Sequence, residues 1–168
     1  MKNMMIAAVL AAAGAGAAQA GFYVETEPNN TLAQANFVGN YTFPGDAFLV
    51  DGNITRADED WFVFTVTDAT QIRASTFGRP DSSLGDSLLY LFDSNGTQLA
   101  FDDDSGVNLY SSLEYNTTGG GTFYLKVASF QGASSFDYKL VVGLNVIPTP
   151  GPLALAGLGA LVALRRRR

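Results

Sequence analysis

Acidic and amide side chains gather in one short segment near the start of this chain, in a pattern that suits a hard metal ion. The segment from Glu25 to Asn30 has the sequence ETEPNN, so four of its six side chains are carboxylates or amides. Ca²⁺ prefers oxygen ligands, about six to eight of them, and a short segment of this kind can wrap around it. The same residues also suit a solvated arm, or a helix cap at Asn30 or Thr31. The residue types alone leave both interpretations open.

A second acidic group, Asp58-Glu59-Asp60, directly precedes a predicted strand that starts at Trp61. Adjacent carboxylates repel one another unless a cation or backbone N–H groups compensate their charge. In a loop open to water this repulsion would be mostly screened, and the group would need no partner. The chemistry therefore leaves a cation site and a solvated loop equally open.

A third acidic group, Asp102-Asp103-Asp104, looks at first like the start of an EF-hand calcium loop. That loop needs Gly at its sixth position and Glu at its twelfth. Counted from Asp102, those positions are Val107 and Leu113, so neither requirement is met. The group is better interpreted as an acidic β-turn.

The chain contains no cysteine and no histidine. A thiol nucleophile, a Ser-His-Asp triad and a histidine-ligated zinc or iron site are therefore excluded. A glycosidase needs two suitably spaced carboxylates, but nothing in the sequence selects two of the sixteen acidic residues. We therefore expect a non-catalytic protein, with a carboxylate-dependent glycosidase as a less favoured alternative.

Charge is unevenly distributed between the ends and the middle of the chain. Residues 21–147 hold all sixteen acidic residues and five basic ones, which gives this part a net charge of −11. Binding to nucleic acid depends on neutralising phosphates with Lys and Arg, so no nucleic acid is expected as a partner. Divalent cations are the natural partners of such a chain.

The middle of the chain alternates apolar and polar residues with a period of two, and turn residues separate the segments, which is typical of β-strands. The sequence DSNG at 93–96 predicts a hairpin turn. The predicted strands are 48–54, 60–66, 71–76, 88–92, 98–101, 111–115, 122–128 and 136–142. About eight short strands predict an all-β, jelly-roll-like β-sandwich.

Trp61 lies on the face of its predicted strand opposite Phe62 and Phe64. If it were exposed, it could stack on a sugar ring together with Tyr115, and the protein would be a carbohydrate-binding module for a defined glycan. A second layer could instead bury it, as large aromatic side chains commonly are. Core packing is the favoured interpretation.

The first twenty residues have the pattern of a secretory signal peptide. Lys2 supplies a positive charge, Met4–Ala18 is an alanine-rich apolar stretch, and Ala18-Gln19-Ala20 is a cleavage site with small residues. We therefore expect export, with residues 1–20 removed and a folded domain over residues 21–144. This length suits a single domain.

Residues 145–168 have the pattern of a linker followed by a short hydrophobic helix. The apolar run from Pro152 to Leu164 has 13 residues, about 20 Å if helical, which is short for a permanent span of about 30 Å. Arg165–Arg168 would stay on the cytoplasmic side of the inner membrane. This end resembles the PEP-CTERM sorting signal of Gram-negative bacteria, with Pro148-Thr149-Pro150 in place of Pro-Glu-Pro. The resemblance implies an exosortase-type sorting enzyme as a partner and transient residence in the inner membrane.

The domain between these ends resembles the bacterial pre-peptidase C-terminal (PPC) domain, a jelly-roll-like β-sandwich often appended to secreted peptidases. The similarity runs from Glu25 to Val142 and rests on short motifs in the family's order. They are EPNNT at 27–31, GNI at 52–54, DWFVF at 60–64, DSLLYLFDSNG at 86–96, DDD at 102–104, GTFYLKV at 121–127 and YKLVV at 138–142.

Collagen-binding members of this family hold calcium between an acidic N-terminal segment, acidic residues before a strand rich in Trp or Tyr, and a tyrosine near the last strand. By this resemblance, the first two acidic groups form a structural Ca²⁺ site. Asp58 is offset by one residue from the family's second acid. The implied metal ligands are Glu25, Glu27, Asn29, Asn30, Asp58, Asp60 and Tyr138.

The two ends and the PPC-like domain together predict an exported, non-catalytic protein of the cell surface or extracellular matrix. Its expected work is adhesion to an extracellular polysaccharide or protein. Calcium is expected to stabilise the domain that does so.

Overall fold

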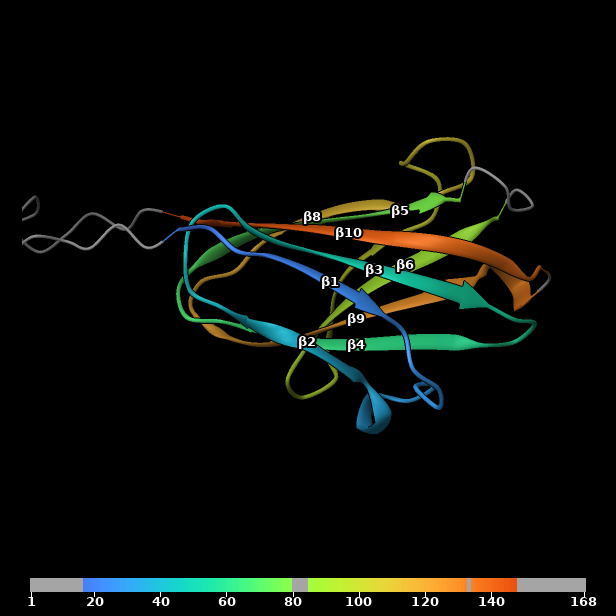
Figure 1. The fold of residues 1–168 in the computed structure, drawn as a ribbon, viewed down its shortest axis with the longest axis horizontal. Helices are drawn as coiled ribbons and strands as arrows, with labels where there is room; N and C mark the ends of the chain where they lie inside the picture. The colour runs from blue at the N-terminus through green and yellow to red at the C-terminus, as the bar shows by residue number, and fades with distance from the viewer. Residues whose placement is uncertain (1–16, 80–84, 133, 148–168) are drawn as a thin grey trace, which may run out of the picture.

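A computed structural model describes residues 17–79, 85–132 and 134–147 (Figure 1). Most of the predicted signal peptide and the whole predicted C-terminal helix lie outside these residues. Within them, no helix has the length and apolar character needed to cross a membrane. The described residues form two layers of β-sheet.

The described part of the chain contains ten strands and two short 3₁₀ turns. They are β1 (Ala20–Val24), η1 (Leu32–Gln34), β2 (Asn36–Tyr41), β3 (Asp46–Ile54), β4 (Glu59–Val66), β5 (Thr70–Gly78), β6 (Ser87–Asp93), β7 (Gln98–Asp102), β8 (Ser112–Asn116), β9 (Gly121–Ser129), η2 (Phe130–Gly132) and β10 (Phe136–Val146). The first sheet has the order β1-β3-β10-β5-β8, and the second sheet has the order β2-β4-β9-β6-β7.

In both sheets, the edge strand that comes first in the chain runs parallel to its neighbour. β1 pairs with β3 and β2 pairs with β4 in this way, whereas the other neighbouring strands are antiparallel. The chain leaves the first sheet at Val24 and enters the second at Asn36, so residues 25–35 cross from one layer to the other (Figure 1). We call residues 25–35 the crossing segment. It brings the N-terminal acidic residues to the end of the sandwich where β4 begins, since Trp61 N–H donates to the Asn29 carbonyl at 3.0 Å.

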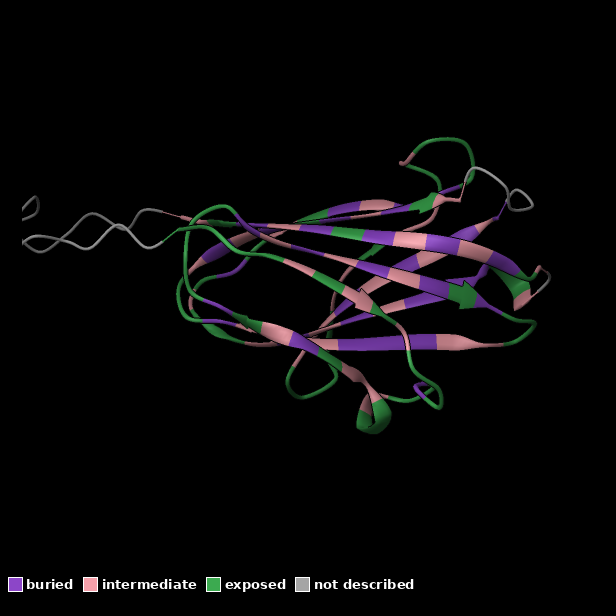
Figure 2. Ribbon diagram, in the orientation of Figure 1, coloured by how far each residue is buried: buried purple, intermediate pink, exposed green. Residues whose placement is uncertain are grey.

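The hydrophobic core lies between the two sheets and follows the period-two pattern of the strands (Figure 2). Phe62 and Phe64 in β4 are completely buried, as are Leu140 and Val142 in β10. Alternate residues of a strand point to one face, so these side chains meet in the space between the layers. Burying each of them contributes about 1.5–3 kcal/mol. The core therefore fixes the positions of β4 and β10, the two strands that carry residues of the candidate site.

The predicted all-β sandwich is confirmed, and the structure adds two strands, β1 and β2, to the eight that were predicted. Both are edge strands, and Phe22 and Val24 of β1 are more than 60 % exposed, at 64 % and 63 %. β2 has a register shift between Phe37 and Asn40, and Gly39 has a φ of 121°. A bulge of this kind breaks the period-two pattern by which strands are recognised in a sequence.

The predicted hairpin is also confirmed, because β6 and β7 are antiparallel neighbours. In the turn between them, Asp93 Oδ1 accepts the N–H groups of Asn95 and Thr97, each at 2.8 Å. The crossing segment contains the single turn η1, but Thr31 before it makes no side-chain capping hydrogen bond. Helix capping is therefore not what the polar residues of this segment do.

Candidate calcium site

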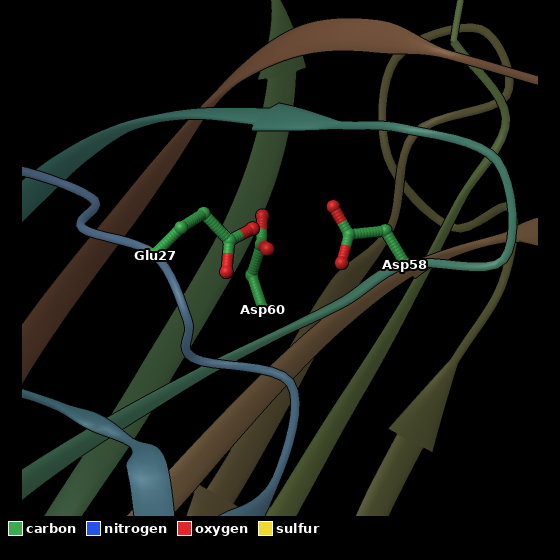
Figure 3. A group of neighbouring side chains, drawn as sticks. All are labelled: Glu27, Asp58 and Asp60. Carbon is green, nitrogen blue, oxygen red and sulfur yellow. The ribbon is translucent and has the colours of Figure 1, made fainter.

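Three carboxylates meet at the end of the sandwich where β4 begins (Figure 3). Glu27 comes from the crossing segment, Asp58 from the loop before β4, and Asp60 from β4 itself. One carboxylate oxygen of each lies within 4.8 Å of the other two. Calcium binds oxygen at about 2.3–2.6 Å, so two of its ligands can lie up to about 5 Å apart. The spacing of the three carboxylates fits a cation between them.

Strand geometry explains why Asp58 and Asp60 share this position and Glu59 does not. Successive side chains of an extended chain point in opposite directions. Glu59 accordingly lies on the other face, where its Oε1 is 2.8 Å from Lys126 Nζ and its Oε2 accepts the indole N–H of Trp61 at 3.2 Å. The acidic run therefore divides into two candidate ligands and one surface ion pair.

Asp60 is completely buried, and it is held from the opposite sheet. Its Oδ2 accepts a hydrogen bond from the hydroxyl of Tyr138, in β10, at 2.6 Å. Burial raises the pKa of Asp60 to about 9, and the adjacent Glu25 adds to this rise, whereas the Tyr138 hydroxyl opposes it. Without a cation, Asp60 therefore carries a proton at neutral pH.

Glu25 lies beside Asp60 at the start of the crossing segment. Its Oε1 accepts the backbone N–H of Asn53 at 2.6 Å, and its Oε2 lies 3.4 Å from the Tyr138 hydroxyl. Burial raises the pKa of Glu25 above its ordinary value, and this outweighs the hydrogen bonds with Asp60 and Asn53, which lower it. The Tyr138 hydroxyl thus lies between the buried Asp60 and the partly buried Glu25, which belong to two separate segments.

Asn29 is completely buried and fastens the crossing segment to the carboxylates. Its backbone N–H donates to Glu27 Oε2 at 2.9 Å. Its side-chain NH₂ can donate to Glu27 Oε2 at 3.1 Å and to Asp60 Oδ1 at 3.3 Å. If the Asn29 amide is rotated by 180°, its oxygen instead of its NH₂ group faces the same two carboxylates. A cation among the three oxygens would stabilise that orientation. Asn29 can therefore serve the site with or without a metal.

Asp58 is partly exposed and is oriented by its own loop. Its Oδ2 accepts the backbone N–H of Thr55 at 3.3 Å and the Thr55 hydroxyl at 3.1 Å, and its Oδ1 accepts the N–H of Glu59 at 3.1 Å. Glu27 is exposed. The site is therefore buried at Asp60 and open to solvent between Glu27 and Asp58, which leaves a path by which an ion could enter.

The structure brings together six of the seven residues implied by the PPC resemblance. The exception is Asn30, which is exposed, and no hydrogen bond between described residues joins it to the others. Sequence reasoning missed the residues that hold the six in place, such as Asn53 and Thr55. It also missed Asn36, whose side chain accepts the N–H of Thr26 at 2.7 Å. Asn53 and Asn36 act on residues that are distant in the chain, so no short motif reveals them. Thr55, by contrast, lies three residues before Asp58, a spacing at which Ser and Thr commonly form local hydrogen bonds.

Tyr138 reaches the acids because its neighbour in β3, Gly52, has no side chain. A Cβ atom on Gly52 would lie 2.5 Å from the Tyr138 hydroxyl oxygen and 2.6 Å from its Cε1. Real Cβ atoms do not approach other heavy atoms so closely. The ring therefore lies directly over the glycine backbone, and this contact sets where the hydroxyl points.

Trp61 does not form an exposed platform for a sugar, because it is 8 % exposed. Its ring stacks on Phe92 with 4.9 Å between ring centroids, and Lys126 Nζ lies 5.5 Å from its centroid. Tyr115 is partly buried and packs against the core. The interpretation of Trp61 as a buried residue is confirmed.

Residues 58–129 match the protein family described as the bacterial pre-peptidase C-terminal domain. The matched residues include Asp58 and Asp60, whereas the crossing segment and Tyr138 lie outside them. No curated protein matches this chain. The family match therefore covers the β4 half of the candidate site.

Several solved structures resemble this chain. The pre-peptidase C-terminal domain of a collagenase from Bacillus anthracis has 20 % sequence identity and a TM-score of 0.48, and the alignment covers 64 % of this chain and 93 % of that one. A periplasmic inhibitor of g-type lysozyme from Aeromonas hydrophila has 9 % identity and a TM-score of 0.48, covering 77 % and 100 %. The corresponding inhibitor from Salmonella Typhimurium has 16 % identity and a TM-score of 0.40, covering 64 % and 98 %.

Proposed function

We propose that this protein is an exported, non-catalytic β-sandwich that binds Ca²⁺ and adheres to a polysaccharide or protein at the cell surface or in the extracellular matrix. The observation that carries the calcium part is the meeting of Glu27, Asp58 and Asp60, with carboxylate oxygens within 4.8 Å of one another. Export and sorting rest on the signal patterns at the two ends of the sequence. The match of residues 58–129 to a domain often appended to secreted peptidases supports them.

The donor set at this site suits calcium better than a transition metal. All candidate ligands offer oxygen, and the chain has no Cys or His to supply softer ligands. Glu27 and Asp58 would supply negatively charged ligands on the solvent-exposed side of the ion. Asp60 and the side-chain amide oxygen of Asn29, turned toward the ion, would supply ligands on its buried side. Calcium binding would displace the proton from Asp60, because a metal ligand must be deprotonated.

Bound calcium would fasten the crossing segment to the sandwich. Glu27 and Asn29 belong to that segment, whereas Asp58 and Asp60 belong to the β4 region of the second sheet. An ion held by both would add to the hydrogen bond between Trp61 N–H and the Asn29 carbonyl, while exposed residues such as Glu27 and Asn30 bury little surface. The segment would then keep β1 and β2 in their places at the edges of the two sheets.

The same geometry argues against catalysis by these carboxylates. A glycosidase needs both carboxylates to reach the glycosidic bond from either side. Asp60 is completely buried and bonded to Tyr138, so it cannot contact a substrate. This leaves a structural role for the acid that has the most strongly raised pKa.

Calcium titration of the full-length protein, purified in mild detergent and stripped of metal with a chelator, tests the proposal. Extracellular modules bind calcium at about 10⁻⁴–10⁻³ M. At ten times Kd, binding to the folded state alone stabilises it by about 1.4 kcal/mol, which raises Tm by about 5 °C. Glu27→Gln should abolish most of this rise, because it removes a charged ligand at the open side.

Glu114→Gln is the matched control, because Glu114 is an exposed acid that pairs with Arg73 and lies in β8, an edge strand of the first sheet, whereas β4 belongs to the second sheet. It should keep the full calcium response. If the wild type shows no response to millimolar calcium, or if Glu27→Gln responds like the control, the calcium part of the proposal is wrong. Fractionation of the producing cells tests export separately, and full-length protein retained in the cytoplasm would contradict it.

A further inference from the structure

A second group of carboxylates lies at a different place in the sandwich, around the β6–β7 hairpin. Asp86 immediately precedes β6, and Asp103 and Asp104 immediately follow β7. Since β6 and β7 are antiparallel, with Leu89 opposite Asp102, the start of one strand lies beside the end of the other. One oxygen from each of the three acids lies within 4.8 Å of the other two.

One oxygen in this group is buried without any partner. Asp103 Oδ1 has less than 1 Å² of accessible surface and no hydrogen bond, and it is the one such side-chain atom among the described residues. The adjacent Asp102 differs sharply, because its Oδ2 accepts the N–H groups of Ser105 at 3.0 Å and Ser112 at 2.7 Å. Asp102 therefore shapes the turn, whereas the buried oxygen of Asp103 is left unexplained by the protein's own contacts.

The three acids, Asp86, Asp103 and Asp104, have no ion-pair partner among the described residues. Burial raises the pKa of Asp86, and the charges of Asp103 and Asp104 raise it further. A buried carboxylate oxygen among like charges is unfavourable unless a cation accompanies it.

We infer that Asp86, Asp103 and Asp104 form a second calcium-binding site, in which the orphaned Asp103 Oδ1 is a ligand. Three carboxylates with no nitrogen or sulfur donor favour a hard, oxygen-binding ion. The ligands come from two separate segments, so a linear motif such as the EF-hand does not describe them. The inference does not depend on the site at Glu27, since no residue is shared.

Calcium at this position would order the loop between β7 and β8. That loop is closed by Gly106 N–H donating to the Tyr110 carbonyl at 2.8 Å, and it exposes Val107 and Leu109, at 62 % and 48 %. Asp103 and Asp104 form its first part, and Asp86 belongs to the neighbouring strand start. An ion shared by them would fix the loop to the hairpin and hold its two exposed apolar side chains in place.

Amide NMR titration of the full-length protein in detergent micelles with CaCl₂ tests the inference, with NaCl of equal ionic strength as the reference. The amides of residues 103–106 should shift at millimolar CaCl₂, independently of the amide of Asn29 at the first site. Asp103→Asn should abolish the shifts at 103–106 and keep the shift at Asn29. Glu27→Gln should do the opposite.

Thermal melts in the presence of a chelator test whether a variant loses its calcium shifts because it is unfolded. Asp103→Asn should melt no lower than the wild type there, because it removes a repelling charge that has no partner. Asp104→Asn, at an exposed position, should likewise keep its fold and weaken the calcium shifts at 103–106. If residues 103–106 do not shift with CaCl₂, or shift equally in Asp103→Asn, the second site does not exist. If they shift and Asn29 does not, the second site stands and the proposed first site fails.

Discussion

Gly52 is the position at which a single added methyl group should disturb both the core and the candidate calcium site. A Cβ atom there would lie 2.5 Å from the Tyr138 hydroxyl oxygen, and the Tyr138 ring is completely buried and cannot swing into solvent. Gly52→Ala therefore forces the ring away from β3. Overpacking of this kind costs about 1–3 kcal/mol. Moving the hydroxyl away from Asp60 and Glu25 costs about 1 kcal/mol more in lost hydrogen bonds.

The expected total is a loss of about 2–4 kcal/mol, which lowers Tm by about 10 °C for a unit of this size. Gly143→Ala in β10 is the matched control, because it also adds a methyl group inside a strand. A Cβ on Gly143 has no heavy atom within 4 Å. The control should be neutral or slightly stabilising, since replacing Gly by Ala restricts the unfolded chain.

Thermal melts of the two variants, each with a chelator and with millimolar CaCl₂, separate packing from site geometry. Gly52→Ala should lose stability in both conditions and should also lose most of the calcium-dependent rise in Tm. Equal stability of Gly52→Ala and Gly143→Ala would refute the packing of Tyr138 on Gly52. A destabilised Gly52→Ala with an unchanged calcium response would show that the position of the Tyr138 hydroxyl does not matter for the metal.

Two further predictions concern other parts of the sandwich. Burial by itself would raise the pKa of Asp46, but N–H groups from Gln19, Phe43 and Thr42 outweigh it and lower that pKa. Because the folded pKa is below the unfolded value of about 3.9, this stability is present above about pH 4 and is lost as the pH falls further. In the full-length protein, which retains Gln19, Asp46→Asn should therefore cost about 1–3 kcal/mol in urea unfolding at pH 7 and markedly less at pH 3, and an equal cost at both would contradict the carboxylate's role. Trp61, the chain's single tryptophan, should show blue-shifted emission that iodide quenches poorly and that soluble glycans leave unchanged. A strongly quenched emission that responds to a glycan would restore the carbohydrate-binding alternative.

The central strands could be predicted from the sequence because their packing and their pattern have the same cause. β4 and β10 are covered by the other sheet on one face, so every second residue must be apolar. β1 and β2 escaped prediction because edge strands tolerate exposed apolar residues such as Phe22, and because β2 contains a bulge near Gly39. These two strands were not predicted because they lie at the edges of the sheets, where burial constrains the residue pattern least.

The candidate site was only partly predictable for a different reason. Composition and spacing marked Glu27, Asp58 and Asp60 as acidic residues but left their role open, and the choice of ligands came from a family resemblance. The group of Asp86, Asp103 and Asp104 was missed because only Asp102-Asp103-Asp104 was tested, as one linear loop with ligands counted along the chain. Antiparallel pairing of β6 with β7 brings them together instead, and that contact becomes visible when the hairpin is built in three dimensions.

The distribution of positive charge links the two acidic groups. Residues 21–147 contain five basic residues, and four of them form ion pairs with acids that belong to neither group. The pairs are Arg73 with Glu114, Arg79 with Asp51 and with Asp137, Lys126 with Glu59, and Lys139 with Asp51. The buried Asp60 and the buried Oδ1 oxygen of Asp103 take part in none of the ion pairs between described residues. If both proposed sites bind calcium, the stability of the fold would depend on the calcium concentration around it, because an ion bound by the folded state alone stabilises that state.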